Sequence, residues 1–303
     1  QSGLPGGGAA ASEAAARERA AGAILDRYWL AAATGKKSDP GCVVRIEAVR
    51  ILGEWRVHRA ADVFFDAAET VQVERSGNGL EDVAIPLRVQ AAAALGSLRP
   101  PGALLALSVL LFDDDPRVDV LPQDRPYRTL VVRKAAARSL AVLGDPGGAA
   151  VLGVRLSRPA GELPEVLTEC MDALKALDEA AALKMISPYL RNPDPYLAAS
   201  AATTLAALSE PFHGVVLERL SQALVDRIDE ARPAIALAIA SMRCDDAVTA
   251  LSDLARRGEE SVALEAVAAL AERGDSLARS ALAAIAAEAE DHLIRMKAKR
   301  ALE

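Results

Sequence analysis

The stretch Val131–Pro146, VVRKAAARSLAVLGDP, contains a helix together with the residues that end it. Its alanines, leucines and valines recur at helical spacing, which predicts an amphipathic helix with one apolar face. A Leu-Gly pair then closes the pattern, because glycine readily adopts the left-handed conformation that follows many helices. Asp145-Pro146 predicts a turn. Similar stretches recur along almost the whole chain, including RVQAAAALGSL at residues 88–98 and RNPDPYLAASAATTLAAL at residues 191–208.

The repeat is clearest at the position of Leu140. An aliphatic residue occupies the equivalent position at Leu52, Leu95, Leu140, Leu174, Leu205, Ile239, Leu270 and Leu302. From Leu140 onward these positions lie 31–34 residues apart, and the two earlier intervals are 43 and 45 residues. Each interval also holds a second apolar helix and a polar loop. A repeat of this length with two amphipathic helices predicts an α-solenoid, in which each hairpin packs on its neighbours.

Each repeat is expected to consist of a first helix, a short turn and a second helix. Glycines 53, 96, 144 and 274 are predicted to end first helices, and Asp194 and Asp291 to cap the following ones. The first helices are predicted over residues 43–53, 87–96, 131–143, 165–177, 197–208, 231–242, 262–272 and 293–302. The second helices are predicted over residues 57–71, 102–112, 148–156, 179–190, 215–226, 247–256 and 277–290.

The N-terminal part differs from the repeats. Residues 1–11 are expected to form a flexible, glycine-rich lead-in, and Ser12 to cap a helix over residues 13–33. Residues 12–303 then form a single repeat domain. Its repeats start near residues 43, 87, 131, 165, 197, 231 and 262, with a partial eighth from residue 293. This last helix is either the polar cap of the stack or the start of a further repeat.

The quoted stretches resemble HEAT repeats of the short, phycobilisome-lyase-like type, over residues 39–303. The resemblance implies an all-α, right-handed superhelix of about seven HEAT-like hairpins with an N-terminal capping helix. In that family the arginine of the Val-Arg pair and an aspartate of the turn form a ladder between neighbouring repeats. The matching arginines here are Arg45, Arg88, Arg133 and Arg295. Repeats four to seven have no clean match, so the ladder is expected to be incomplete.

The composition supports the prediction of a helical fold and argues against some classes of binding partner. Apolar residues make up 51% of the 303 residues and aromatic residues only 3%, which favours closely packed helices over strands. The net charge of −7 argues against nucleic acid as the main partner, because phosphate binding needs a basic surface. No apolar run is long enough to span a membrane.

Cys42, Cys170 and Cys244 fall in different repeats and are expected to be free thiols, the latter two in the core.

The N-terminal residue allows two predictions for the cellular compartment. The chain begins with Gln1 instead of Met, as it would after removal of a signal peptide or behind the remnant of a tag. The cytoplasm is the default expectation, and export with a removed signal peptide is the alternative.

Two loops are longer than the repeat requires: residues 72–86, QVERSGNGLEDVAIP, and residues 113–130, DDDPRVDVLPQDRPYRTL. Stacking in register should bring them to one edge. Alternating apolar residues around a Ser-Gly-Asn-Gly turn predict a small hairpin in the first loop. Long loops in repeat proteins often bind partners. The candidate partner-binding residues are Glu74, Arg75, Asn78, Asp113, Asp114, Asp115, Arg117, Asp124, Arg125 and Tyr127, with Trp29 from the aromatic-rich N-terminal region.

No catalytic, metal-binding or cofactor-binding constellation is predicted. His58, His213 and His292 fall in different repeats. None precedes a glutamate, so the His-Glu pairs of deoxyhypusine hydroxylase, an iron enzyme with this type of fold, are absent. Asp113–Asp115 lacks the spacing of a calcium loop.

We therefore expect a protein–protein interaction scaffold or adaptor without catalytic activity, with another protein as its partner. One alternative is a HEAT-fold enzyme, such as a lyase or a base-excision glycosylase-like protein. Ionisable side chains that converge in a cleft would favour that alternative, and a smooth face of mixed charge would favour the scaffold. The other alternative is a structural subunit of a larger assembly.

Overall fold

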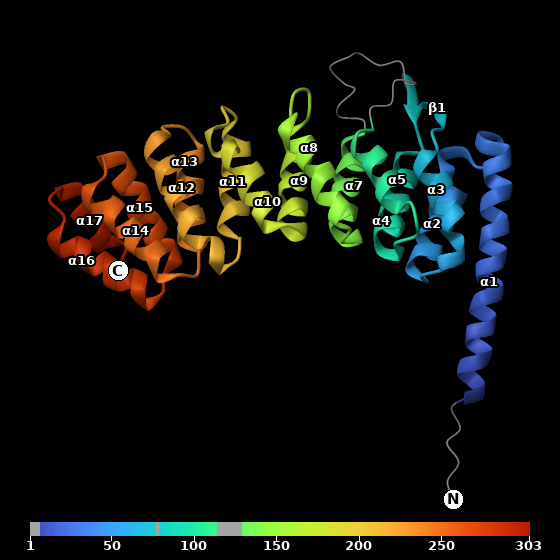
Figure 1. Ribbon diagram of the computed structural model, residues 1–303, viewed down its shortest axis with the longest axis horizontal. Helices are drawn as coiled ribbons and strands as arrows, with labels where there is room; N and C mark the ends of the chain where they lie inside the picture. Colours follow the sequence, from blue (N-terminus) through green and yellow to red (C-terminus); the bar gives the residue numbers. More distant parts are fainter. Residues whose placement is uncertain (1–6, 77–78, 114–128) are drawn as a thin grey trace, which may run out of the picture. The chain divides into compact units, whose positions relative to one another are not determined.

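The computed structural model describes residues 7–76, 79–113 and 129–303, and most of that chain is helical (Figure 1). First and second helices alternate along the sequence, as the repeat period predicts. Within the described ranges the only strands form one two-stranded sheet. The protein is an all-α solenoid built from helical hairpins.

The observed helices lie within a few residues of the predicted bounds. The first helices are α2 (Val43–Glu54), α4 (Ile85–Leu98), α7 (Leu130–Leu143), α9 (Pro164–Leu177), α11 (Pro195–Ala206), α13 (Ala231–Ser241), α15 (Glu260–Arg273) and α17 (His292–Arg300). The second helices are α3 (Ala61–Glu69), α5 (Ala103–Leu111), α8 (Pro146–Ser157), α10 (Glu179–Ile186), α12 (His213–Asp226), α14 (Asp245–Arg257) and α16 (Ser276–Glu288). Short 3-10 turns are η1 (Gly35–Lys37), η2 (Pro40–Cys42), η3 (His58–Ala60), η5 (Ser187–Arg191) and η6 (Glu210–Phe212). None of the described helices is both long and apolar enough to cross a membrane.

The chain divides into two compact units. Unit 1 consists of residues 1–151 and 160–169, and unit 2 of residues 152–159 and 170–303. In unit 1 the first helices α2, α4 and α7 pack side by side, with α3 on α4 and α5 on α7. In unit 2 the first helices α11, α13, α15 and α17 pack in the same sequential way.

The core of each unit contains one aliphatic side chain from each first helix, at the predicted repeat position. The fully buried members are Leu52, Leu95 and Leu140 in unit 1, and Leu174, Leu205, Ile239 and Leu270 in unit 2. Leu302 differs, with 42% of its surface exposed, because α17 ends at Arg300 before reaching it.

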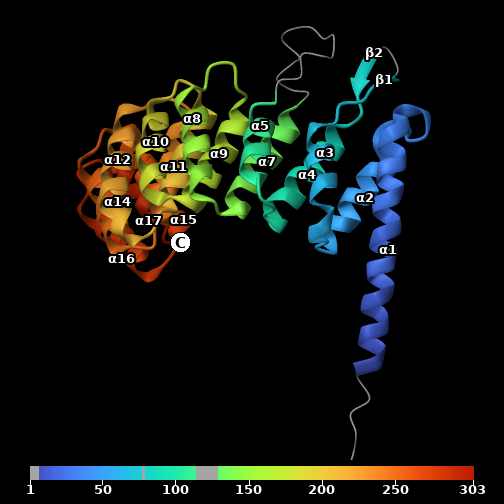
Figure 2. The ribbon, with the colours of Figure 1, turned by 45° about the vertical axis from the view of Figure 1, so that its right-hand side comes forward.

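The N-terminal helix α1 (Gly7–Thr34) packs on α2 and α3 within unit 1, and Figure 2 shows α1 beside α2. It begins before Ser12, so the predicted N-cap is wrong. The alanines at positions 9–11 are strong helix formers and extend the helix. Tyr28 fixes α1 to α3, because its hydroxyl donates a 2.6 Å hydrogen bond to Asp66 Oδ2. Its ring is fully buried, and this burial raises the pKa of the phenol above its usual value.

The predicted hairpin is present in unit 1. Strands β1 (Val73–Ser76) and β2 (Gly79–Asp82) pair antiparallel, with Val73 opposite Asp82 and Ser76 opposite Gly79. The strands are shorter than the alternation predicts, because Ile85 already belongs to α4. The turn residues 77–78 lie outside the described residues.

Buried arginines join successive repeats of unit 1, as the resemblance implies. Each contacts the connection that leads to the next first helix. Arg45 donates to Gln72 Oε1, Arg88 Nε lies 3.3 Å from Asp113 Oδ2, and Arg133 Nη2 lies 3.1 Å from Glu162 Oε1.

The turn before the helix supplies a carboxylate to two of these arginines. Arg45 Nε lies 2.8 Å from Asp39 Oδ2, and Arg88 Nη1 lies 2.7 Å from Asp82 Oδ2. Cys42 lies against Arg45, with Arg45 Nη2 3.1 Å from its sulfur. Burial raises the pKa of this thiol to about 11, so Cys42 remains protonated at neutral pH.

The ladder position recurs in unit 2 at Arg232, which the sequence interpretation missed. Arg232 precedes Ile239 by the seven residues that separate Arg133 from Leu140. Its side chain is buried and its Nη1 donates a 2.7 Å hydrogen bond to Ser261 Oγ, in the next repeat. Cys170 is buried as expected, whereas Cys244 is only half-buried, and both are free thiols.

Two of the four predicted helix-ending glycines end helices. Gly144 and Gly274 have positive φ directly after α7 and α15. Gly53 and Gly96 instead lie inside α2 and α4, so that prediction is wrong for them. The left-handed positions belong to Arg56 and Arg99, both with φ 55°. Arg56 Nη2 donates to Ser97 O at 3.5 Å and Arg99 Nη2 to Val142 O at 2.9 Å, near the end of the next first helix.

Gly96 permits the close packing of α4 on α7, and its replacement by alanine should lower the free energy of unfolding by about 1–3 kcal/mol. An alanine Cβ there would lie 2.8 Å from Ser139 O and 2.9 Å from Ser139 Cβ. Gly53→Ala is the matched control at the same repeat position, because its Cβ would meet only Ala94 Cβ at 3.4 Å. Alanine's better helix propensity should leave this variant unchanged or up to about 1 kcal/mol more stable. Denaturant titration followed by circular dichroism measures both, and equal effects would contradict the close α4–α7 contact.

Candidate partner-binding surfaces

The candidate residues in the first long loop lie on the β1–β2 hairpin. Arg75 is exposed and stands opposite Leu80, which is also exposed. Glu74 is half-buried, and its Oε1 accepts hydrogen bonds from Gly41 N at 2.9 Å and from Gln72 Nε2 at 2.6 Å. Glu74 therefore holds the hairpin on η2, whereas Arg75 faces solvent.

The candidate residues of the second long loop are mostly outside the described residues. Asp113 is described, and its backbone carbonyl accepts a 2.7 Å hydrogen bond from Thr129 Oγ1. This contact joins the two residues that flank the undescribed segment. Asn78 and six residues of that segment, Asp114, Asp115, Arg117, Asp124, Arg125 and Tyr127, lie outside the described residues.

Trp29 is 42% exposed on α1, next to the exposed Leu30. Its ring packs edge-on against Tyr28, with the ring centroids 5.2 Å apart. The indole is thus partly packed against the buried Tyr28 and partly accessible to solvent.

A groove crosses the first helices of unit 1, which the sequence interpretation did not assign. It has a volume of about 520 Å³ and is lined by residues of α2, α4 and α7. Its middle is formed by α4, where Val89, Ala93 and Ser97 reach the surface. Ala135 and Val142 of α7 continue the apolar lining. The result is a shallow, mainly apolar groove whose middle carries small side chains.

The charged groups beside this groove are already paired. Arg50 Nη2 lies 2.8 Å from Glu47 Oε2 and its Nη1 lies 2.7 Å from Glu54 Oε1. On the opposite side, Arg138 Nε donates a 2.6 Å hydrogen bond to Glu169 Oε1. The groove therefore has rims of mixed charge, with its ionisable groups directed at one another.

A sequence signal for the groove exists in the repeat. Arg50, Ala93 and Arg138 each stand two residues before a fully buried leucine, which is a solvent-facing helix position. At this position the middle repeat has a small alanine, and the repeats on either side have long arginines. This difference in side-chain size indicates a groove over the middle helix.

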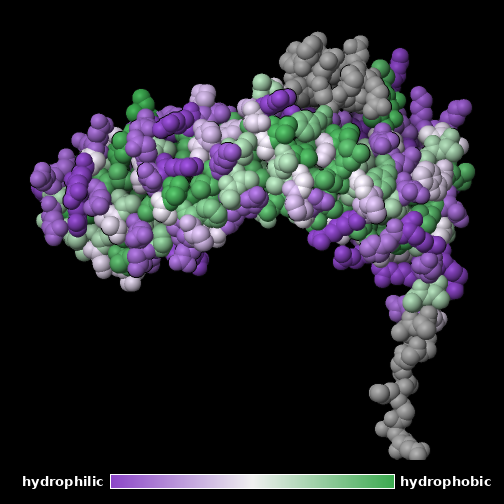
Figure 3. Space-filling view, in the orientation of Figure 1, coloured by the Kyte–Doolittle hydropathy of each residue, from purple (hydrophilic) through white to green (hydrophobic). Residues whose placement is uncertain are grey.

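An apolar stripe lies on α5, in unit 1. This helix has no charged residue. Leu105 and Val109 are 71% and 62% exposed, and Phe112, directly after the end of the helix, is 42% exposed. Figure 3 shows apolar side chains gathered over α5. Contiguous exposed apolar surface of this kind commonly contacts another macromolecule.

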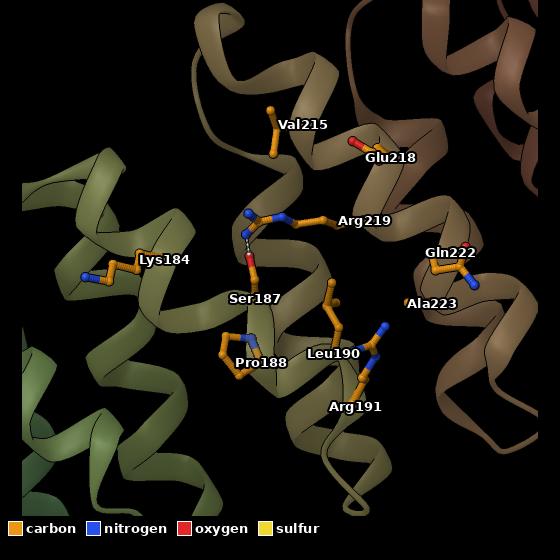
Figure 4. A pocket seen from close by; sticks show the side chains of 10 residues that line it. All are labelled: Lys184, Ser187, Pro188, Leu190, Arg191, Val215, Glu218, Arg219, Gln222 and Ala223. Atoms are coloured by element: carbon orange, nitrogen blue, oxygen red, sulfur yellow. Dashed lines mark hydrogen bonds between the residues drawn. The ribbon is translucent and has the colours of Figure 1, made fainter.

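Unit 2 contains a larger pocket between α10–η5 and α12, with a volume of about 670 Å³ (Figure 4). Its lining combines Lys184, Arg191 and Arg219 with Glu218 and the apolar side chains of Pro188, Leu190 and Val215.

Solved structures similar to this chain include other helical proteins. The complex of CpcE and CpcF of phycocyanin lyase from Nostoc sp. PCC7120 is 24% identical, with 86% of this chain and 88% of that chain covered and a TM-score of 0.41. Human deoxyhypusine hydroxylase in complex with glycerol is 16% identical, with 83% and 97% covered and a TM-score of 0.36. A structure from work on a phosphorylation switch between cadherin and beta-catenin is 15% identical, with 86% and 58% covered and a TM-score of 0.35.

A phycocyanin lyase complex is thus among the similar structures, in line with the resemblance of the repeats. No protein-family model matches the chain, and no curated protein matches it either.

Proposed function

We propose that the chain is a non-catalytic protein-binding scaffold, and that the groove across α2, α4 and α7 receives a segment of a partner protein. The groove itself carries this proposal. A volume of about 520 Å³ over three adjacent helices suits several side chains of a polypeptide. The small side chain of Ala93 in the middle of the groove would let a partner backbone approach closely.

The charges favour binding over catalysis. Catalysis needs an ionisable group directed at the reacting atoms, with a partner that tunes it. In this groove Arg50 is held by Glu47 and Glu54, and Arg138 by Glu169. Paired charges at the rim of an apolar centre are typical of protein interfaces.

The expected occupant is an amphipathic segment with aliphatic side chains on one face and both signs of charge at its edges. Its aliphatic face would contact Val89, Ala93 and Val142, and its charged edges would meet Arg50 and Arg138 with their carboxylate partners. We further propose that Arg75 and Trp29, exposed elsewhere on unit 1, add contacts to the same partner.

Site-specific cross-linking tests the proposal. Gln90 lines the groove, and Glu265 occupies the same repeat position on α15 of unit 2. A p-benzoylphenylalanine placed at Gln90 should form a discrete protein adduct in cells, identified by mass spectrometry, that the same substitution at Glu265 does not form. Adding Ala93→Arg should abolish the adduct, because the long cationic side chain would fill the middle of the groove.

The matched control is Ala268→Arg, since Ala268 is exposed at the equivalent position of α15. This variant should keep the adduct formed from position 90. An adduct that survives Ala93→Arg, or that is lost equally with Ala268→Arg, would contradict the assignment of the groove.

A further inference from the structure

The pocket of unit 2 differs in charge from the rest of the molecule. The chain carries a net charge of −7, yet the pocket is lined by three cationic side chains, Lys184, Arg191 and Arg219, and by one carboxylate, Glu218. A local excess of positive charge on an acidic protein creates a potential that attracts anions. The ion pair between Arg191 and Asp226 is long, at 3.9 Å, and both side chains are exposed, so the pair is weak.

Arg219 is held in place at the centre of the pocket. Its Nη1 donates to Leu183 O at 3.2 Å and to the hydroxyl of Ser187, as Figure 4 shows for Ser187. Ser187 in turn donates to Leu183 O, at the end of α10. Both bonds use one nitrogen, and a guanidinium carries five N–H groups on three nitrogens. In the part of the chain that the structure describes, no carboxylate forms an ion pair with Arg219. The remaining donors are thus positioned for an external acceptor.

The cations are spread along the pocket. Lys184 lies on α10, Arg191 is the last residue of η5, and Arg219 lies on α12. Figure 4 shows Lys184, Arg219 and Arg191 at separate places around the opening. A single compact anion cannot contact all three. A chain with several negative groups can, and Pro188, Leu190 and Val215 offer apolar contacts between the charges.

We propose that this pocket binds an acidic segment of a partner protein, with carboxylates spaced to meet Lys184, Arg219 and Arg191. This inference goes beyond the proposed groove of unit 1, because it concerns different helices and a different partner chemistry. Arg219 pairs with one carboxylate at the centre, and the two outer cations select segments with further negative charges.

Fluorescence anisotropy with a fluorescein-labelled octaglutamate peptide tests the proposal on the full chain. Binding is expected at low ionic strength and should weaken in high salt, because screening reduces the attraction between exposed charges. The variant Lys184→Gln/Arg191→Gln/Arg219→Gln should weaken binding on the order of tenfold or more. Circular dichroism should show unchanged helicity, since these residues line a surface pocket.

The charge-matched control is Arg243→Gln/Arg257→Gln/Arg279→Gln. These three exposed arginines also belong to unit 2 but do not line the pocket. The control should change the affinity by less than about twofold, as should Ala93→Arg, so this site and the unit 1 groove are tested separately. The proposal is wrong if octaglutamate does not bind, if both triple variants lose affinity equally, or if inorganic phosphate competes at the affinity of the peptide.

Discussion

Replacing Arg88 with alanine should lower the free energy of unfolding by about 3–5 kcal/mol. The side chain is 2% exposed, and it lies 2.7 Å from Asp82 Oδ2 and 3.3 Å from Asp113 Oδ2. Its Nη1 also donates to Thr70 O at 2.9 Å. Without the guanidinium, Asp82 and Asp113 each lose an ion-pair partner, and Asp82 is itself buried. Denaturant titration of the purified variant, followed by circular dichroism, measures the loss.

The control for Arg88 is Arg75→Ala, which removes an exposed arginine of the hairpin in the same unit. That variant should unfold at the same denaturant concentration as the original protein. A loss for Arg88→Ala of about 1 kcal/mol or less, typical of an exposed ion pair, would show that the buried network does not hold α4 in place. The groove depends on this helix, because α4 supplies its middle.

Replacing Leu140 with alanine should lower the free energy of unfolding by about 2–5 kcal/mol. Leu140 is fully buried in α7, which packs on both α4 and α5. The truncation removes buried methyl groups and leaves a cavity that the surrounding helices fill only partly. Calorimetric or denaturant unfolding measures the change.

Leu105→Ala is the comparison for Leu140, because Leu105 is 71% exposed in the neighbouring helix α5. Its truncation should change the stability by about 0.5 kcal/mol or less. Equal losses for the two leucines, or a negligible loss for Leu140, would contradict the register that places one aliphatic residue of each first helix in the core.

The repeat period was enough to predict the helices, since each first helix must bury the same position against its neighbours. The hairpin was also predictable, because alternation and a glycine-rich turn act locally. The sequence interpretation missed Arg232, because the arginines it matched all follow a valine, leucine or isoleucine and this arginine follows Ala231. The ladder requires only that the arginine occupies the buried position of the helix, so the preceding residue can vary.

The prediction of helix ends was wrong at two glycines, because a glycine can either end a helix or lie inside one where another helix packs closely. Gly144 takes a left-handed conformation after its helix, whereas Gly96 lies inside α4 and makes room for Ser139. A Leu-Gly pair looks the same in both cases. The distinction depends on how closely the next helix approaches, which a single sequence does not contain.

The binding surfaces were the least predictable feature. The long loops were predicted to bind a partner because they interrupt the repeat. Much of the second loop lies outside the described residues. The groove arises from Arg50, Ala93 and Arg138 on three separate helices. Its shape depends on the lateral packing of α2, α4 and α7, so no single stretch of sequence reveals it.

The most direct test of the scaffold proposal is the dissociation constant for the partner identified by cross-linking from position 90. Isothermal titration would compare the original chain with Ala93→Arg and Ala268→Arg, two identical substitutions at equivalent repeat positions. We predict that Ala93→Arg raises the dissociation constant on the order of a hundredfold and that Ala268→Arg leaves it unchanged within about twofold. Equal dissociation constants for the two variants would contradict the proposal that the groove of unit 1 binds the partner.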